Sequence, residues 1–385
     1  MTTGLLTRPF LLLCTQLLAI STIVALFFPL QLYLTSLGIS ERAAGFIIGA
    51  DALAALVVQP FILPLVSARN ARAWLAAGSL VLAAALLAEG TVSRAVPFTA
   101  ARLLQGAGFI CVMTAFMPLL VLCIPPERSG QAFGWISMIR LVPYAAVPPL
   151  FGLLGITPAG FGPVIRWSVL LGLFPALALI FIPASPAEKS AAPGSPLADM
   201  GRSLKDVRLG CLLLATLLVY ASYAITFFFI KGLLAQAGLA HSGLFFTLAT
   251  LVMIAVRLAG GFLFDRFDKA RLTAGALVLS AAAIAALPLC AGMASLLAAA
   301  AVCGAGWGIA MPLLNALGFV ISPPETRGLN QNLIFLMLQA GFFLGPLAGG
   351  MILAQAGYAP LFLAGGALML PAAFLVLMAA SAHDR

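Results

Sequence analysis

Charged residues are scarce in this 385-residue chain, in which only 8% of the side chains are Asp, Glu, Lys or Arg. Soluble domains carry roughly 25% charged residues, so a water-soluble fold of this composition could not cover its surface. Histidine occurs twice, and the six cysteines show neither CxxC nor zinc-ligand spacing. We therefore expect no metal, no cofactor and no disulfide framework. The clustered catalytic His, Asp or Glu residues of an integral membrane enzyme are also missing.

Hydrophobic residues make up 63% of the chain and gather in long runs. Each run is long enough to cross roughly 30 Å of hydrocarbon as a helix, and lipid offers the backbone no other hydrogen-bond partner. The strict alternation of a membrane β-barrel is not seen. The expected fold is an all-α integral membrane protein with twelve transmembrane helices. They are expected at residues 9–34, 43–66, 73–91, 96–122, 131–155, 163–183, 209–236, 241–264, 271–290, 293–320, 329–354 and 358–381.

One gap, residues 184–208, is long, rich in Pro, Ser and Ala, and then charged. It predicts a cytoplasmic linker between an N-terminal six-helix bundle, residues 1–183, and a C-terminal one, residues 209–385. The two halves also resemble each other. A shift of 198 residues pairs GAG at 106–108 with GAG at 304–306, and PPE at 125–127 with PPE at 323–325. Such a parallel repeat is typical of transporter halves related by an axis along the membrane normal.

Lys and Arg residues are distributed unequally between alternate gaps. A cytoplasmic N-terminus places 13 of them inside and 4 outside, and positive charge favours the cytoplasmic side. We expect a multi-pass protein of the cell inner (plasma) membrane with both termini cytoplasmic. The net charge of +9 comes from these gaps, so no nucleic acid partner is indicated. The expected partners are the lipid bilayer, a small-molecule substrate and protons, and the protein is expected to be a monomer.

Four segments carry a resemblance to a known family. Residues 260–271 (GGFLFDRFDKAR) are similar to a signature loop between spans 8 and 9, and residues 102–108 (RLLQGAG) to an R-x-x-Q-G motif in span 4. The paired PPE loops are similar to the turns before spans 5 and 11 of the same family. Residues 341–350 (GFFLGPLAGG) have the form of its G-x-x-x-G-P-x-x-G-G motif in span 11. Together they resemble the major facilitator superfamily, and within it the branch of proton antiporters that export drugs and metallophores. The first copy of the signature loop, at 63–72 (LPLVSARNAR), has lost its Asp.

The resemblance implies two bundles around a central cavity with rocker-switch alternating access. Residues that would serve the inner gate are Asp265, Arg266, Arg271, Gly345 and Pro346. A plain positive-inside loop and simple helix contact are the alternatives for these segments.

Ionisable residues inside spans are costly and usually functional. Asp51 in span 2 and Arg102 in span 4 both lie roughly 9–12 Å deep at 1.5 Å per residue, which makes an ion pair plausible. The pair could carry the coupling proton or be purely structural. Arg140 and Arg257 are the other buried arginines, and Arg257 could bind substrate or contact the gate. Residues that could also line the substrate cavity are Tyr33, Tyr144, Tyr223, Asn315, Asn332 and Gln339.

The excess of buried arginine over aspartate favours a solute that bears carboxylates. The predicted function is proton-coupled export of such a small organic solute. An organic-anion or monocarboxylate carrier working by uptake or exchange is the alternative within the same class. A non-transporting sensor would normally carry a soluble domain, which the sequence does not show.

Overall fold

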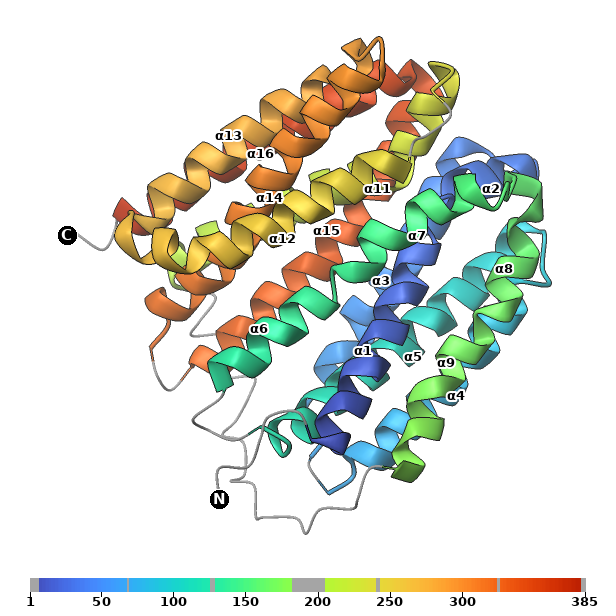
Figure 1. Cartoon of the computed structure of the whole chain (residues 1–385), viewed down its shortest axis with the longest axis vertical. Coiled ribbons are helices and arrows are strands. Elements are labelled where there is room, and N and C mark those ends of the chain that lie inside the picture. Colours follow the sequence, from blue (N-terminus) through green and yellow to red (C-terminus); the bar gives the residue numbers. More distant parts are fainter. Residues whose placement is uncertain are drawn as a thin grey trace. The chain divides into compact units, whose positions relative to one another are not determined.

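The computed structural model describes residues 7–67, 69–124, 129–181, 205–239, 243–323 and 326–381, and every regular element in these ranges is helical (Figure 1). Twelve segments of this described part are long and apolar enough to span a membrane. The predicted all-α fold with twelve spans is therefore confirmed. Most of the expected linker, residues 184–204, lies outside the described ranges.

The helices fall into two compact units, one of residues 1–39 and 50–192, the other of residues 40–49 and 193–385. Helix α3 (Glu41–Ile62) contributes to both. The other helices of the first unit are α1 (Arg8–Leu26), α2 (Leu30–Ser36), α4 (Ala71–Glu89), α5 (Ala95–Val121), α6 (Ser129–Ile139), α7 (Val142–Leu153), α8 (Phe161–Trp167) and α9 (Val169–Ala178). Those of the second unit are α11 (Val207–Gln236), α12 (Gly243–Arg266), α13 (Lys269–Ala286), α14 (Met293–Ile321), α15 (Arg327–Ala356) and α16 (Tyr358–Ser381).

Three spans expected as continuous helices are broken in the first unit. Residues 9–34 divide into α1 and α2, with Pro29 as the N-cap of α2. Residues 131–155 divide into α6 and α7, and Pro143 lies in the first turn of α7. The expected span 163–183 begins earlier, with α8, and continues as α9 after Ser168. Proline has no N–H to donate, so it fits a first helical turn and interrupts a longer helix.

The sequence repeat has a three-dimensional counterpart within each unit. A Cβ on Gly106 of α5 would overlap the backbone carbonyl of Asp51 in α3, and a Cβ on Gly304 of α14 would overlap that of Ala249 in α12. Asp51 and Ala249 are 198 residues apart, as are the two glycines. Only a residue without a side chain permits these backbones to approach so closely.

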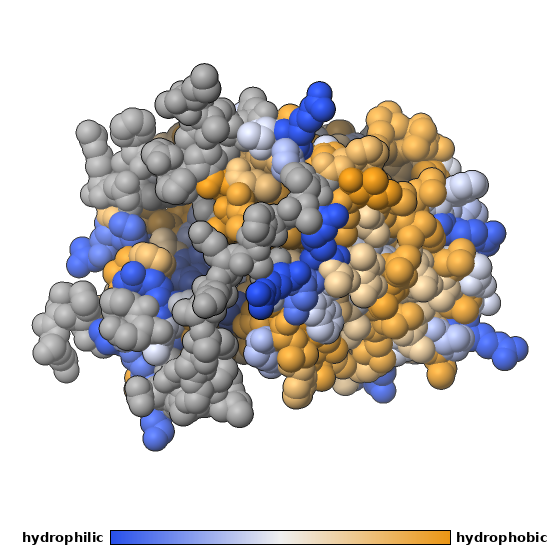
Figure 2. Space-filling model, turned by 90° about the horizontal axis from the view of Figure 1, so that it is seen from below, coloured by the Kyte–Doolittle hydropathy of each residue, from blue (hydrophilic) through white to orange (hydrophobic). Residues whose placement is uncertain are grey.

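Many large apolar side chains are exposed on the described helices, and on the face seen in Figure 2 orange side chains lie among blue ones. Val96, Leu153 and Phe61 are 81%, 80% and 71% exposed. Exposed apolar surface on this scale suits helices that face lipid and not water.

Candidate functional site in the N-terminal unit

The centre of the candidate site is an ion pair between α3 and α5. Nη2 of Arg102 lies 2.8 Å from Oδ1 of Asp51, and the arginine side chain is 1% exposed while the aspartate is 34% exposed. Arg102 also donates a hydrogen bond from Nη1 to Oε1 of Gln105. Its guanidinium carbon lies 4.5 Å from the centre of the Phe27 ring. The guanidinium is thus held by groups from α3, from α5 itself and from the C-cap of α1, and one of these groups can change protonation.

The local sequence explains why this pair forms. Gly106 brings the backbone of α5 against Asp51, and Arg102 lies one turn earlier on the same helix face. The R-x-x-Q-G pattern therefore supplies a guanidinium, an amide that supports it and the glycine that permits the approach. The structure brings Asp51 and Arg102 together as the sequence predicted, while their role in proton coupling stays a prediction.

A second carboxyl group, which the sequence reading did not single out, lies in the same region. Glu89 is the last residue of α4 and is 0% exposed. Neither of its carboxyl oxygens has a hydrogen-bond partner within the described part of the chain. The charges of Arg102 and Asp51 both act on it through space. Glu89 lies two residues before the end of the expected span 73–91, where an acid usually faces water at the membrane surface. The pattern of apolar residues alone does not show that this side chain is buried.

A cluster of aromatic side chains that includes Tyr33 lies near Glu89. Tyr33 in α2 is 5% exposed and lies edge-on to Phe161, with ring centres 5.3 Å apart, and 6.2 Å from Phe98. Glu89 and Arg166 both act electrostatically on its hydroxyl. Tyr33 is therefore placed beside the carboxyl group, in an aromatic cluster, and its expected contact with substrate stays a prediction.

The second half of the repeat has no such charges. The positions that correspond to Asp51, Arg102 and Glu89 are Ala249, Ala300 and Leu287, which are 1%, 0% and 1% exposed. The same helix contacts thus form in the second unit with small or apolar side chains only.

Arg140 lies at the break between α6 and α7, where its side chain is exposed. Within the described residues its guanidinium has no hydrogen bond or ion pair. Tyr144, one turn further in α7, is half-buried. Arg140 lies within the membrane-spanning segment Trp135–Leu153, as expected, and its role in substrate binding stays a prediction.

The predicted substrate residues of the second unit are spread over three helices. Tyr223 in α11 is 7% exposed and its ring centre lies 4.8 Å from that of Trp307. Asn315 in α14 is exposed and donates from Nδ2 to the carbonyl of Met311 at 3.0 Å. In α15, Asn332 is half-buried and Gln339 is 6% exposed.

The segments predicted to gate are described in part. Arg257 in α12 is half-buried, whereas the side chains of residues 261–266, including Asp265 and Arg266, lie outside the described set. Asp268 caps α13 through a 2.7 Å hydrogen bond from the backbone N–H of Arg271, whose side chain is exposed. This cap is a typical helix-start contact.

In α15, Gly345 and Pro346 are both buried. A Cβ on Gly345 would overlap the backbone carbonyl of Ala221 in α11. The motif thus serves close helix contact within the second unit, and its gating role stays a prediction.

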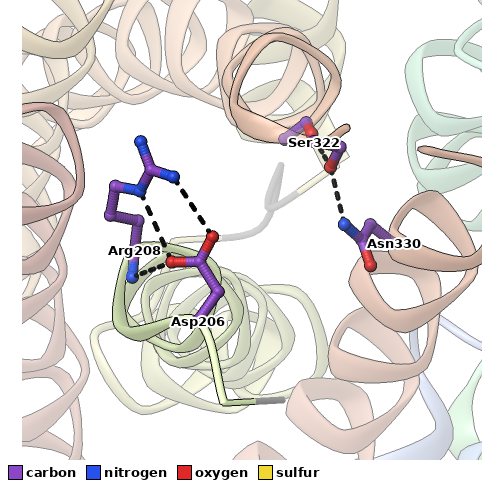
Figure 3. A network of polar contacts seen from close by, with 5 residues as sticks. Asp206, Arg208, Ser322 and Asn330 are labelled. Atoms are coloured by element: carbon purple, nitrogen blue, oxygen red, sulfur yellow. Dashed lines mark hydrogen bonds and ion pairs between the residues drawn. The ribbon is translucent and has the colours of Figure 1, made fainter. Parts of the chain in front are cut away.

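Two polar contacts at helix ends of the second unit were not predicted from the sequence (Figure 3). At the start of α11, Arg208 pairs with the N-cap Asp206 at 3.4 Å. Nδ2 of Asn330 in α15 donates to Oγ of Ser322, the C-cap of α14, at 2.8 Å. Within the described ranges no three His, Cys, Asp or Glu side chains gather as metal ligands would.

Comparison with known proteins decides the family, because the sequence profile of the Major Facilitator Superfamily matches residues 10–329 and 212–385. The chain belongs to this superfamily. Its members are transporters that work by alternating access. A search of curated proteins found no match.

Solved structures agree on the fold. The nucleoside transporter NupG matches with a TM-score of 0.79 and 16% identity over 97% of this chain and 99% of its own. A bacterial homologue of the human lysosomal transporter Spinster, inward-facing and unoccupied, matches with a TM-score of 0.75 and 14% identity, over 99% and 96%. At such identities the likeness concerns the fold and not the substrate.

Proposed function

We propose that this major facilitator couples proton movement to the export of a small organic solute that bears carboxylates. The observation that carries the proposal is the pair of Asp51 and Arg102 in the N-terminal unit. A carboxylate held by one buried guanidinium is a group whose proton binding can alternate with ion pairing. The alanines at the matching positions of the second unit support a chemical role for the pair, because the fold forms there without it.

Arg140 supports the carboxylate specificity. It is exposed on its unit, inside the membrane-spanning segment Trp135–Leu153. An arginine at that depth is costly against lipid and normally faces the bundle interior or a water-filled cavity. A guanidinium in a cavity can bind a carboxylate through two parallel hydrogen bonds.

An organic-anion carrier working by uptake or exchange is the second candidate, favoured by the same arginine. The nucleoside transporter NupG shares the fold, but at 16% identity it gives no reason to transfer its substrate to this chain. From the 13 to 4 asymmetry of Lys and Arg we further propose that both termini lie in the cytoplasm of a cell inner membrane. The protein is proposed to work as a monomer.

The test uses purified protein in liposomes loaded with the pH indicator pyranine. Benzoate, succinate and citrate serve as anionic probes and ethidium as the cationic one. A carboxylate probe should move the internal pH and follow an imposed pH gradient. Arg140→Lys keeps the charge but loses the fork of donors, so carboxylate transport should fall about tenfold, the loss expected for a hydrogen bond to a charged group. Arg94→Lys changes another exposed arginine of the first unit and should behave as wild type.

Two outcomes would contradict the proposal. Transport of ethidium but of no carboxylate, with normal activity in Arg140→Lys, would make this an ordinary cation exporter. Carboxylate transport that ignores the pH gradient would favour the exchange carrier.

A further inference from the structure

Glu89 is a buried acid without the contacts that an ionised carboxylate needs. Its side chain is 0% exposed, and both oxygens lack hydrogen-bond donors among the described residues. An ionised carboxylate normally accepts several hydrogen bonds or lies against a cation when it is buried. A protonated carboxyl group is far less demanding, so this surrounding suits the neutral acid.

The nearby charges do not supply a dedicated partner. Arg102 acts on Glu89 through space, but its direct ion pair is with Asp51 of α3. Arg166 of α8 is exposed, and its Nη2 donates to the carbonyl of Gly90 at 3.2 Å. Tyr33 of α2 is buried beside Glu89 and is neutral, and α9, which also packs against α4, carries no ionisable residue.

Two carboxyl groups thus depend on one buried guanidinium. We propose that Glu89, Asp51 and Arg102 form a proton-binding site in which the two carboxyl groups share one proton, and that Glu89 holds it when Asp51 is paired with Arg102. The use of this proton in transport rests on the function proposed above, whereas its presence on Glu89 does not.

The site has two states of equal net charge. With Asp51 ionised and Glu89 protonated, Arg102 balances Asp51. When a proton binds Asp51, the ion pair is lost, and the released guanidinium can balance Glu89 as the Glu89 proton leaves. One proton is taken up and one released, and the buried net charge is zero before and after. When the proton leaves Glu89 in concert with proton binding to Asp51, the exchange avoids the state with both acids protonated, in which the buried guanidinium would be uncompensated and costly.

Comparison with the second unit indicates that Glu89 is not required for folding. Leu287 occupies the position of Glu89 in the repeat and is 1% exposed. An apolar side chain fills this place at the helix end, so the fold itself does not call for a carboxyl group there.

Infrared spectroscopy of the full chain in lipid nanodiscs tests the proposal. The carbonyl stretch of a protonated carboxylic acid should be present in neutral buffer, absent in Glu89→Gln and unchanged in Glu41→Gln, a matched change at a half-buried glutamate of α3. Asp51→Asn frees Arg102 for Glu89, so the band should disappear in neutral buffer and return only in acid, although Glu89 is still present. This second variant keeps the test decisive if Glu89→Gln folds poorly.

Three results would overturn the inference: no such band in the wild type, a band that survives in Glu89→Gln, or a band that Asp51→Asn leaves unchanged in neutral buffer. The pyranine assay separates this inference from the proposed function. If the band behaves as expected but carboxylate transport ignores the pH gradient, the proton site stands and proton coupling fails. If transport follows the pH gradient while the wild type lacks the band, the proposed proton on Glu89 is refuted and the proposed proton coupling stands.

Discussion

Replacing Asp51 by Asn should destabilise the protein because it leaves a buried arginine without its main counter-charge. At the observed 2.8 Å and an effective dielectric constant of about 20, the attraction between unit charges is about 6 kcal/mol. Dehydration of both groups consumes much of this, and breaking a buried pair typically costs roughly 3–5 kcal/mol. Since Asp51 is 34% exposed, we expect the low end, about 3 kcal/mol.

The assay is thermal unfolding of purified protein in detergent, followed with a dye that becomes fluorescent on reacting with cysteine. Cys14 and Cys303 are buried and free, so they become reactive only as the helices separate. If 385 residues unfold with the entropy per residue of soluble domains, 3 kcal/mol lowers the midpoint by about 4 °C.

Two double variants sharpen this expectation. Asp51→Asn/Arg102→Met removes both charges while keeping most of the arginine volume, and should recover much of the lost stability without recovering the pH response. Asp51→Asn/Glu89→Gln removes both acids near Arg102 and should be the least stable of the set. The reasoning is refuted if Asp51→Asn matches the wild type while Asp51→Asn/Arg102→Met unfolds earlier, because the stability of buried Arg102 would then not depend on its pair with Asp51.

Three further experiments test the fold and the predicted gate. Gly106→Ala should lower stability by about 1–3 kcal/mol through overlap with Asp51, whereas Gly152→Ala, with open space around it, should be neutral or stabilising; equal midpoints would contradict the close crossing. Asp265→Asn should sharply reduce transport at unchanged membrane levels, and full activity would leave this loop as a topology signal only. A cysteine at Ser67 should be shielded from an impermeant thiol reagent in whole cells, whereas one at Ser40 should react; the reverse pattern would invert the proposed orientation.

The fold could be predicted well because its determinants are local. Lipid requires every backbone group to bond within its own segment, so twelve apolar runs already specify twelve spans. The breaks within spans were harder to predict. Pro29 and Pro143 end one helix and begin another, whereas Pro346 lies inside the continuous helix α15. Whether a proline interrupts a span depends on neighbouring helices that can satisfy the freed carbonyls.

Contacts in the candidate site could be predicted where they depend only on how deep two residues lie in the membrane. Asp51 and Arg102 lie at similar depth in neighbouring spans, and they pair. Rotation about the helix axis decides the other cases. Glu89 sits at a helix end, where an acid can equally face water, yet it faces inward. Arg140 lies well inside a span, at the break between α6 and α7, and its side chain is exposed.

The comparison of the two halves bears on whether the ion pair is structural or chemical. If Asp51 and Arg102 served only to hold α3 against α5, the equivalent contact of α12 with α14 would need a substitute of similar strength. It has none: Gly304 reaches Ala249 directly, and Ala300 fills the place of the arginine. Small residues at close distance hold such helices together without charge. Burying an ion pair where an apolar contact suffices costs stability and is seldom retained for packing alone. The charges of the first half are therefore not needed to join the two helices, which supports the proposal that they bind and release a proton.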